Sequence, residues 1–341
     1  MKRRTLGSTG MSVSEFALGA MMFGSLGNPD HEDAIRIIHS ALDAGINFID
    51  TADVYSRGES EEIVGKAVKG RRDDLVVATK FGRPMGEDPN QRGGSRRWIV
   101  REVENSLRRL DTDYIDLYQI HRPDYETEIG ETLSALSDLV RAGKIRAFGS
   151  SMFPAEMIVE AQWAAERQGS RRFLTEQPIY SIFTRKIEAA VLPTAQRHGL
   201  GVLTFSPLNS GWLSGRADLT SSHRAVLTSS ALPSHYDSST PTGRLKAAAL
   251  AKLTVLADEA GMTLPRLATA FVRAHPAVTS VLIGPRTQEQ LDGLLSGADI
   301  ELSSDVLDRI DEIVPPGTDL DPADNYAATP PAIESARLRR R

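Results

Sequence analysis

The sequence contains no cysteine, no long apolar run and no marked excess of charge of either sign. Without cysteine a disulfide-based scaffold is excluded, and the composition fits the reducing cytoplasm, where we expect the protein to reside. No run approaches the roughly 18 apolar residues that a transmembrane helix needs. The net charge of −5 gives no reason to expect nucleic acid or an anionic membrane as a partner. These absences favour a globular protein that acts on a small molecule.

Common metal and nucleotide motifs are also missing. Gly65-Lys66 follows Gly58 after six residues and precedes Ala67, whereas a phosphate-binding loop has the pattern GxxxxGK[ST]. His31-Glu32 lacks a second histidine one helical turn later, and no GxGxxG segment follows an expected strand. We therefore expect no metal site.

What the sequence does contain is a regular alternation of short apolar segments and amphipathic segments. The first helix is expected after Asp30, which can cap it, and Gly45 follows its end. Further helices are expected at residues 95–110, 128–142 and 185–198. Strands are expected at residues 15–18, 46–49, 75–79, 114–120, 145–149, 173–176, 201–205 and 278–283.

Strands that alternate with helices pair in parallel, and eight such units predict a single (β/α)8 TIM barrel with extended loops at its C-terminal face. An open doubly wound sheet is the second possibility. We expect the barrel domain to span residues 1–317 and a C-terminal tail to span 318–341, where it can flank the substrate pocket. The irregular stretch 206–241 is rich in Ser, Gly and Pro and is a candidate active-site loop.

Polar residues suited to proton chemistry stand where the expected strands end. In a barrel these ends converge on one rim, where catalytic residues gather. They are Asp50 with the nearby Tyr55, Lys80, His121, Ser151, Gln177 and Ser206.

Four segments with these residues resemble the aldo-keto reductases. They are GINFIDTADVY at 45–55, Thr79-Lys80, DLYQIH at 116–121 and IGPRT at 283–287. The resemblance covers nearly the whole chain in order, and the family's catalytic tetrad falls on Asp50, Tyr55, Lys80 and His121. It implies an NADP(H)-dependent carbonyl reductase on a (β/α)8 barrel, with the nicotinamide across the C-terminal rim.

The chemistry of the four residues suits that reaction. Carbonyl reduction needs a hydride at carbon and a proton at oxygen, where negative charge develops. A tyrosine with its ordinary pKa of about 10 is a weak acid for that task. A cationic Lys80 beside Tyr55 would favour the phenolate form, Asp50 would hold Lys80, and His121 would hydrogen-bond the substrate oxygen.

The resemblance also implies a set of cofactor contacts. Ser151 and Gln177 match the residues that hold the carboxamide, and Phe205 matches an aromatic that stacks on the nicotinamide. The pyrophosphate loop is matched by Ser206, Pro207, Leu208, Gly211, Leu213 and Gly215, and the adenosine phosphate site by Gly284, Arg286 and Gln290. Three positions depart from the family pattern: Met152 replaces an asparagine, and Gly293 and Leu294 stand where a Glu-Asn pair commonly meets adenine.

From the sequence we predict an NADP(H)-dependent aldo-keto reductase that reduces an aldehyde or ketone to an alcohol, with Tyr55 as proton donor. The alternative is a cofactor-binding regulatory subunit, because the potassium-channel β subunits resemble the same barrel. The expected partner is a small carbonyl substrate, which could be a sugar-derived ketone or a reactive aldehyde. The sequence does not specify the natural substrate or the oligomeric state.

Overall fold

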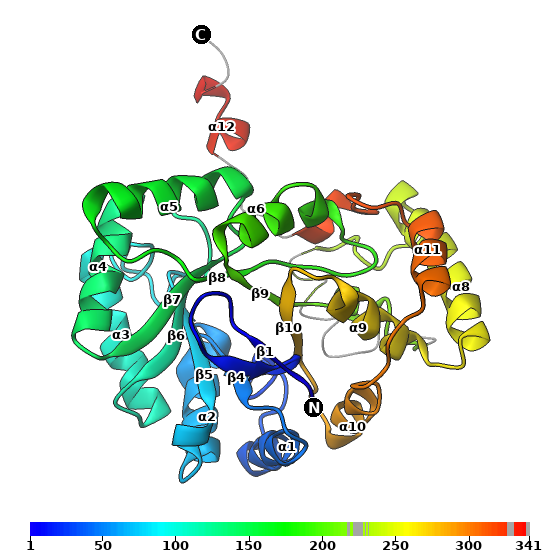
Figure 1. Ribbon diagram of the computed structural model, residues 1–341, viewed down its shortest axis with the longest axis horizontal. Coiled ribbons are helices and arrows are strands. Elements are labelled where there is room, and N and C mark those ends of the chain that lie inside the picture. Colours follow the sequence, from blue (N-terminus) through cyan, green and yellow to red (C-terminus); the bar gives the residue numbers. More distant parts are fainter. Residues whose placement is uncertain (217–218, 221–227, 229, 231, 326–330, 339–341) are drawn as a thin grey trace.

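Eight parallel strands of the described chain close into a barrel (Figure 1). The computed structural model describes residues 1–216, 219, 220, 228, 230, 232–325 and 331–338. Around the barrel the strand order is β10-β3-β4-β5-β6-β7-β8-β9. The strands are β3 (Phe16–Gly19), β4 (Phe48–Asp50), β5 (Val76–Phe81), β6 (Ile115–Ile120), β7 (Ile145–Ser151), β8 (Thr175–Gln177), β9 (Gly201–Thr204) and β10 (Val278–Ile283). The predicted (β/α)8 barrel is confirmed, and the open sheet is excluded because β10 pairs with both β3 and β9.

Helices surround the strands, and the expected cap at Asp30 forms. Asp30 accepts a hydrogen bond from the Asp33 amide at the start of α1, and Ser95 accepts one from the Trp98 amide at the start of α3. The described helices are α1 (His31–Asp43), α2 (Glu59–Val68), α3 (Arg96–Leu110), α4 (Ile129–Arg141), α5 (Ala155–Gln168), α6 (Val191–His198), α8 (Pro241–Glu259), α9 (Leu264–Ala274), α10 (Gln288–Leu295), α11 (Ser304–Ile313) and α12 (Pro331–Glu334).

The helix expected at 185–198 is divided into a short 3₁₀ helix, η3 (Lys186–Ala189), and α6. The break lies at Ala190, which has a φ of −140°. Pro193 explains it, because proline has no amide hydrogen and is tolerated only in the first turn of an α-helix. An unbroken helix would have placed Pro193 in its interior.

An antiparallel hairpin that the sequence analysis missed closes the amino end of the barrel. It consists of β1 (Arg3–Thr5) and β2 (Ser12–Ser14). Leu6 and Val13 are buried in the same cluster as the lumen residues of the strands. The turn lies directly on the barrel, because a Cβ at Gly7 would lie 2.2 Å from the Gly201 nitrogen. Glycine is therefore required at this contact.

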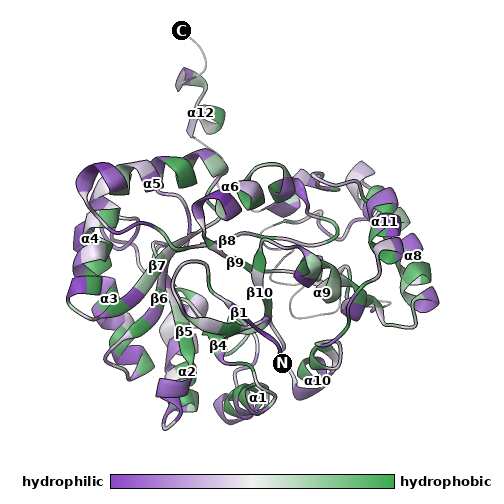
Figure 2. Ribbon diagram, viewed as in Figure 1, coloured by the Kyte–Doolittle hydropathy of each residue, from purple (hydrophilic) through white to green (hydrophobic). Residues whose placement is uncertain are grey.

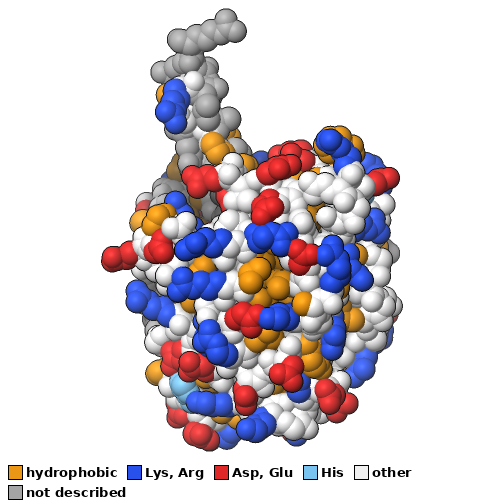
Figure 3. Space-filling model, turned by 90° about the vertical axis from the view of Figure 1, so that its left-hand side faces the viewer, with side chains coloured by type: hydrophobic (Ala, Val, Ile, Leu, Met, Phe, Trp, Pro, Cys, Tyr) orange, Lys and Arg blue, Asp and Glu red, His pale blue; other side chains and the backbone are white. Residues whose placement is uncertain are grey.

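The core has two layers, as the alternation of side chains along a strand requires. The lumen holds a small cluster that includes Phe48, Leu117 and Leu203, and a larger cluster fills the space between the strands and the helices. Figure 2 shows the strands mostly hydrophobic and the helices hydrophilic on one side. On the face seen in Figure 3, acidic and basic side chains are interspersed around a small hydrophobic patch.

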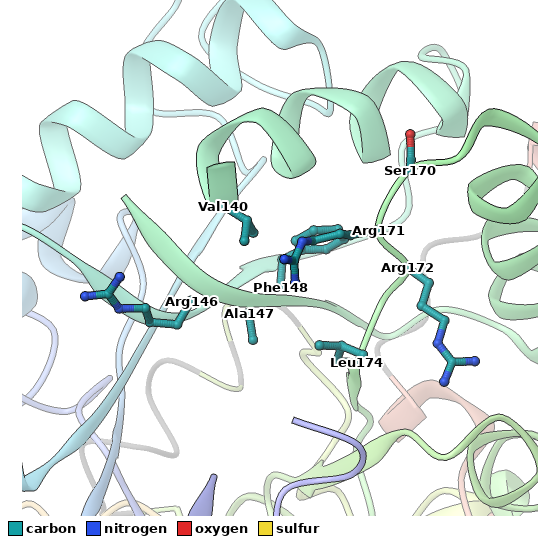
Figure 4. A pocket seen from close by; sticks show the side chains of 8 residues that line it. All are labelled: Val140, Arg146, Ala147, Phe148, Ser170, Arg171, Arg172 and Leu174. Atoms are coloured by element: carbon teal, nitrogen blue, oxygen red, sulfur yellow. The ribbon is translucent and has the colours of Figure 1, made fainter. Parts of the chain in front are cut away.

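A cavity of about 260 Å³ lies at the amino ends of β7 and β8 (Figure 4). Arg146 and Ala147 line it from the start of β7, and Leu174 lines it from just before β8. None of its lining residues belongs to the predicted site. Within the described part of the chain, no helix is long and apolar enough to cross a membrane.

The segment after α11 packs against the barrel. The Leu320 amide donates to the Phe183 carbonyl, and Asp324 forms a buried ion pair with Lys246 at 2.7 Å and a hydrogen bond with His235 at 2.8 Å. Parts of the candidate loop 206–241, namely residues 217–218, 221–227, 229 and 231, lie outside the described residues, as do residues 326–330 and 339–341 of the expected tail. A role for the tail beside the substrate pocket stays a prediction.

Candidate active site

The predicted tetrad residues lie at the carboxyl end of the barrel, and Asp50 and Lys80 lie there because they continue the lumen-facing register of their strands. Phe48 lies in the lumen cluster, and Asp50 follows two residues later on β4. On β5 the same step leads from Ala78 to Lys80. Because side chains alternate along a strand, Asp50 and Lys80 also face inward, above the apolar filling.

A buried ion pair joins Lys80 and Asp50 at the centre of this rim. The Lys80 ammonium also donates to the Thr51 carbonyl at 2.9 Å and to the Tyr55 hydroxyl at 3.3 Å. Burial opposes the charge of Lys80, but the Asp50 carboxylate and Tyr55 outweigh it and raise the pKa of the lysine. Lys80 is therefore a cation at neutral pH, in contact with the Tyr55 oxygen.

Two glutamine side chains complete the surroundings of Asp50. Gln177 donates to the Asp50 Oδ2 atom at 2.9 Å, and Gln119 donates to the same atom at 3.2 Å. Gln177 was predicted as a cofactor contact, whereas Gln119 was not predicted to have a role. The signal for Gln119 was its position, two residues after the lumen residue Leu117. Together the two amides fix the carboxylate that holds Lys80.

Tyr55 and His121 approach the ion pair from the neighbouring loops. Their ring centroids lie 5.6 Å apart, with the rings nearly perpendicular. Burial, reinforced by the charges of Lys80, Arg122 and Arg83, holds the pKa of His121 well below its usual value. His121 is therefore a neutral hydrogen-bonding group at neutral pH, and its buried Nδ1 atom has no partner among the described residues.

Left-handed backbone conformations are concentrated at the same rim. Tyr55 begins a short 3₁₀ helix, η1 (Tyr55–Gly58), in which Ser56 and Arg57 have φ angles of 49° and 57°. Met152 and Ser206, which follow β7 and β9, have φ angles of 61° and 60°. Such conformations are costly for residues other than glycine and cluster at functional sites.

Ser151 and Phe205 lie close to the tetrad network. The Ser151 hydroxyl donates to the Gln177 carbonyl at 2.9 Å, so it is connected to Asp50 through the glutamine. Phe205 directly follows β9 and is half-buried against the lumen cluster. Of the three residues that the sequence assigns to the nicotinamide, Gln177 and Ser151 are therefore part of the tetrad network, and Phe205 lies at the same end of the barrel.

The predicted pyrophosphate loop is a tight turn at the same rim. The Ser210 amide donates to the Ser206 hydroxyl at 3.2 Å, and Gly211 has a φ of 112° with open space where a Cβ would be. Leu213 is fully buried in the outer core. The remaining predicted loop residues are the buried Pro207, the half-buried Leu208 and the exposed Gly215.

The third predicted group lies after β10. The Arg286 amide donates to the Gln290 side-chain oxygen at 2.8 Å, and the Arg286 guanidinium has no ion pair among the described residues. No atom lies closer than 4.0 Å to a Cβ built at Gly284. Leu294 is buried in the core, and nothing lies within 4 Å of a Cβ at Gly293, so neither offers a polar side chain at this site.

Two charged residues at the rim were not foreseen. Glu176 is buried beside Gln177, and burial raises its pKa to about 8 although it accepts hydrogen bonds from Ser150 and the Phe153 amide. Arg122 is half-buried next to His121. Neither residue type signals such a position in the sequence, because burial and pairing depend on neighbouring strands. No group of residues suited to a metal ion occurs in the described part of the chain.

Comparisons with known proteins agree with this geometry. The sequence model of the aldo/keto reductase family matches residues 15–315. The chain is 39% identical to "Uncharacterized oxidoreductase YrpG" of Bacillus subtilis, over 92% of this chain and 96% of that protein. It is 36% identical to "Probable voltage-gated potassium channel subunit beta" of Arabidopsis thaliana, over 92% and 97%, and 41% identical to "Aldo-keto reductase YhdN" of B. subtilis, over 63% and 65%. A chain with this barrel, this rim and these relatives belongs to the aldo/keto reductase family of oxidoreductases.

Proposed function

We propose that the protein is an NADP(H)-dependent carbonyl reductase that converts an aldehyde or ketone into an alcohol, with Tyr55 as the proton donor. The observation that carries the proposal is the contact of the Tyr55 hydroxyl with the Lys80 ammonium, which is itself held by Asp50. When bound, NADPH supplies a hydride to the carbonyl carbon. One further proton must reach the carbonyl oxygen to give the alcohol and NADP⁺.

Tyr55 is suited to deliver that proton because the neighbouring cation stabilises the phenolate that remains. Lys80 keeps its charge through Asp50, and Gln119 and Gln177 keep the carboxylate in place. Neutral His121 would donate a hydrogen bond to the carbonyl oxygen and orient it toward Tyr55. Each of these contributions is electrostatic and needs no movement of the buried network.

The described residues fit the cofactor. Two buried atoms at the rim, Gln119 Oε1 and His121 Nδ1, have no partner among the described residues. Phe205 offers a half-buried ring at the carboxyl end of the barrel, and the Arg286 guanidinium forms no ion pair with any residue that the structure describes. We assign the nicotinamide to Ser151, Gln177 and Phe205, the pyrophosphate to the loop from Ser206 to Gly215, and the adenosine phosphate to Gly284, Arg286 and Gln290.

The second candidate function is that of a cofactor-binding regulatory subunit, which the similarity to the Arabidopsis channel β subunit favours. The two functions differ in turnover. Purified protein is mixed with NADPH and 4-nitrobenzaldehyde, and the loss of NADPH absorbance is followed. Steady reduction above the protein-free rate supports the reductase, whereas tight NADPH binding without turnover of any member of a broad carbonyl panel supports the regulatory subunit. The cytoplasmic location remains a prediction.

A further inference from the structure

Arg122 lies at the rim in an unusual electrostatic position. It directly follows His121, it is half-buried, and it donates a hydrogen bond to the His121 carbonyl at 3.3 Å. A guanidinium has five N–H donors, so most of its hydrogen-bonding capacity is unused by the described residues.

Two other arginines, the buried Arg185 and the half-buried Arg109, are neutralised by carboxylates. Arg185 pairs with Glu188 at 2.8 Å and with Asp311 at 2.7 Å. Arg109 pairs with Glu61 at 2.5 Å and with Glu102 at 2.6 Å. Arg122 has no ion pair with any described residue, although removal from water makes an unpaired charge costly.

A second cation stands beside Arg122. Strands β5 and β6 pair in parallel with Lys80 opposite Gln119 and Phe81 opposite Ile120, and the His121 amide donates to the Phe81 carbonyl at 2.8 Å. Arg83 and Arg122 each stand two residues beyond the ends of these strands, Phe81 and Ile120. Burial, together with the like charge of Arg83, lowers the pKa of Arg122 to about 10, so Arg122 remains a cation at neutral pH.

A carboxyl group that acts electrostatically on Arg122 does not neutralise this pair. It belongs to Glu176, and burial raises its pKa to about 8. Near pH 7 it is therefore mostly protonated. Tyr55, the proposed proton donor, is also within electrostatic range of Arg122. The positive pair thus borders the place where the carbonyl group would be reduced.

We propose that Arg122, supported by Arg83, binds an anionic group, a carboxylate or a phosphate, carried by the carbonyl substrate. The inference rests on the proposed function, because it takes Tyr55 as the point of reduction. A planar guanidinium binds either anion bidentately, and the anion would supply the counter-charge that the described residues lack. The substrate class is accordingly an aldehyde or ketone with a negative charge a few bonds from its carbonyl carbon.

The test compares three aldehydes that differ in one para substituent. 4-Carboxybenzaldehyde and 4-formylphenyl phosphate carry an anionic para substituent. The nitro group of 4-nitrobenzaldehyde has no net charge and nearly the same shape as the carboxylate. The ratio of kcat/KM for each anionic aldehyde to that for the nitro compound is measured for wild type and Arg122→Gln. Intrinsic reactivity cancels when the ratios of the two proteins are compared.

We expect Arg122→Gln to lower at least one ratio by roughly ten- to hundredfold, mainly through KM, because one charge-assisted contact is lost. The aldehyde whose ratio falls more identifies carboxylate or phosphate as the natural group. Arg122→Lys should recover part of the loss, and Arg83→Gln should cause a smaller loss because Arg83 is exposed. Arg146→Gln is the matched control, since Arg146 opens β7 at the other end of the barrel.

Unchanged ratios in Arg122→Gln would overturn the proposal, and so would an equal fall in Arg146→Gln. If wild type reduces neither these three aldehydes nor any member of the broad carbonyl panel, the proposed function fails separately, and binding of benzoate and phenyl phosphate to the NADPH-loaded protein is measured by calorimetry instead. Weaker binding by Arg122→Gln then supports the anion site, and equal binding refutes it. If Arg122→Gln does not fold, Arg122→Lys and Arg83→Gln give the same comparison.

Discussion

At the amino end of the barrel the lumen is filled by Leu6 and Val13 of the hairpin together with Phe48 and Leu117, whereas at the carboxyl end the same strands carry Asp50 and Gln119. The backbone and the alternation of side chains are the same at both ends. The difference lies in what each end must do: apolar side chains pack without partners, while a buried charge needs every hydrogen bond supplied. One end therefore contributes stability, and the other holds a charged network in place for chemistry.

The largest expected effect is on kcat and comes from a change at the carboxyl end of the barrel alone. Tyr55→Phe keeps the ring and removes the hydroxyl that contacts Lys80. Loss of a general acid should lower kcat by roughly a hundred- to ten-thousandfold while NADPH binding is retained. Single-turnover reduction of 4-nitrobenzaldehyde and a fluorescence titration with NADPH measure the two quantities. A kcat near that of wild type would remove Tyr55 from its assigned role.

The converse experiment changes the amino end of the barrel, where we expect a loss of stability and not of kcat. Leu6 is fully buried under the hairpin, and Leu6→Ala should lower the free energy of unfolding by about 2–5 kcal/mol because it leaves a cavity. The kcat of the folded protein should stay close to that of wild type. Urea unfolding and steady-state kinetics test this, with Leu245→Ala as the control because Leu245 is 55% exposed. A large loss of kcat with little loss of stability would contradict the division between the two ends.

The rim also makes stability depend on pH through Glu176. Burial raises its pKa from 4.5 to about 8, so between these values the native state keeps a proton that the unfolded state releases. Stability should therefore fall as pH rises, by about 3 kcal/mol between pH 4.5 and pH 7. Glu176→Gln resembles the protonated acid in shape and hydrogen bonding to Ser150 and the Phe153 amide, so it should remove this decline.

Urea unfolding at several pH values from 5 to 8 measures the effect of Glu176. The difference in unfolding free energy between Glu176→Gln and wild type should grow with pH in favour of the variant. A difference that is constant over this range would mean that Glu176 is ionised in the native protein. Arg122 would then have a carboxylate partner, which links this measurement to the anion site.

The smallest expected effect concerns the cofactor. Arg286 follows β10 at the carboxyl end and has no ion pair among the described residues. A guanidinium can bind the 2′-phosphate that NADPH has and NADH lacks. Arg286→Ala should weaken NADPH binding by roughly ten- to hundredfold and leave NADH nearly unchanged. Equal losses for both cofactors in a fluorescence titration would show that Arg286 does not read the phosphate.

Much of this arrangement was predictable because strand position sets side-chain direction. The expected strands ending near Asp50, Lys80 and His121 placed all three at one rim once a barrel was inferred. The start of β4 was less well predicted: it begins at Phe48 because the Asn47 side chain bonds the Ser14 amide and the Ser12 carbonyl. The hairpin that supplies these groups has short, largely polar strands, which carry little periodic signal.

The sequence by itself determined the eight strand and helix units, the helix cap at Asp30, and the positions of the tetrad, because these depend on local periodicity and on family motifs. Only the tertiary structure decided which polar groups pair with one another and which of them are ionised. The assignment of both Gln119 and Gln177 to Asp50, the raised pKa of Glu176 and the lack of a carboxylate partner for Arg122 among the described residues all arise between strands. Burial and pairing are set by neighbours distant in the chain, and no single segment encodes them.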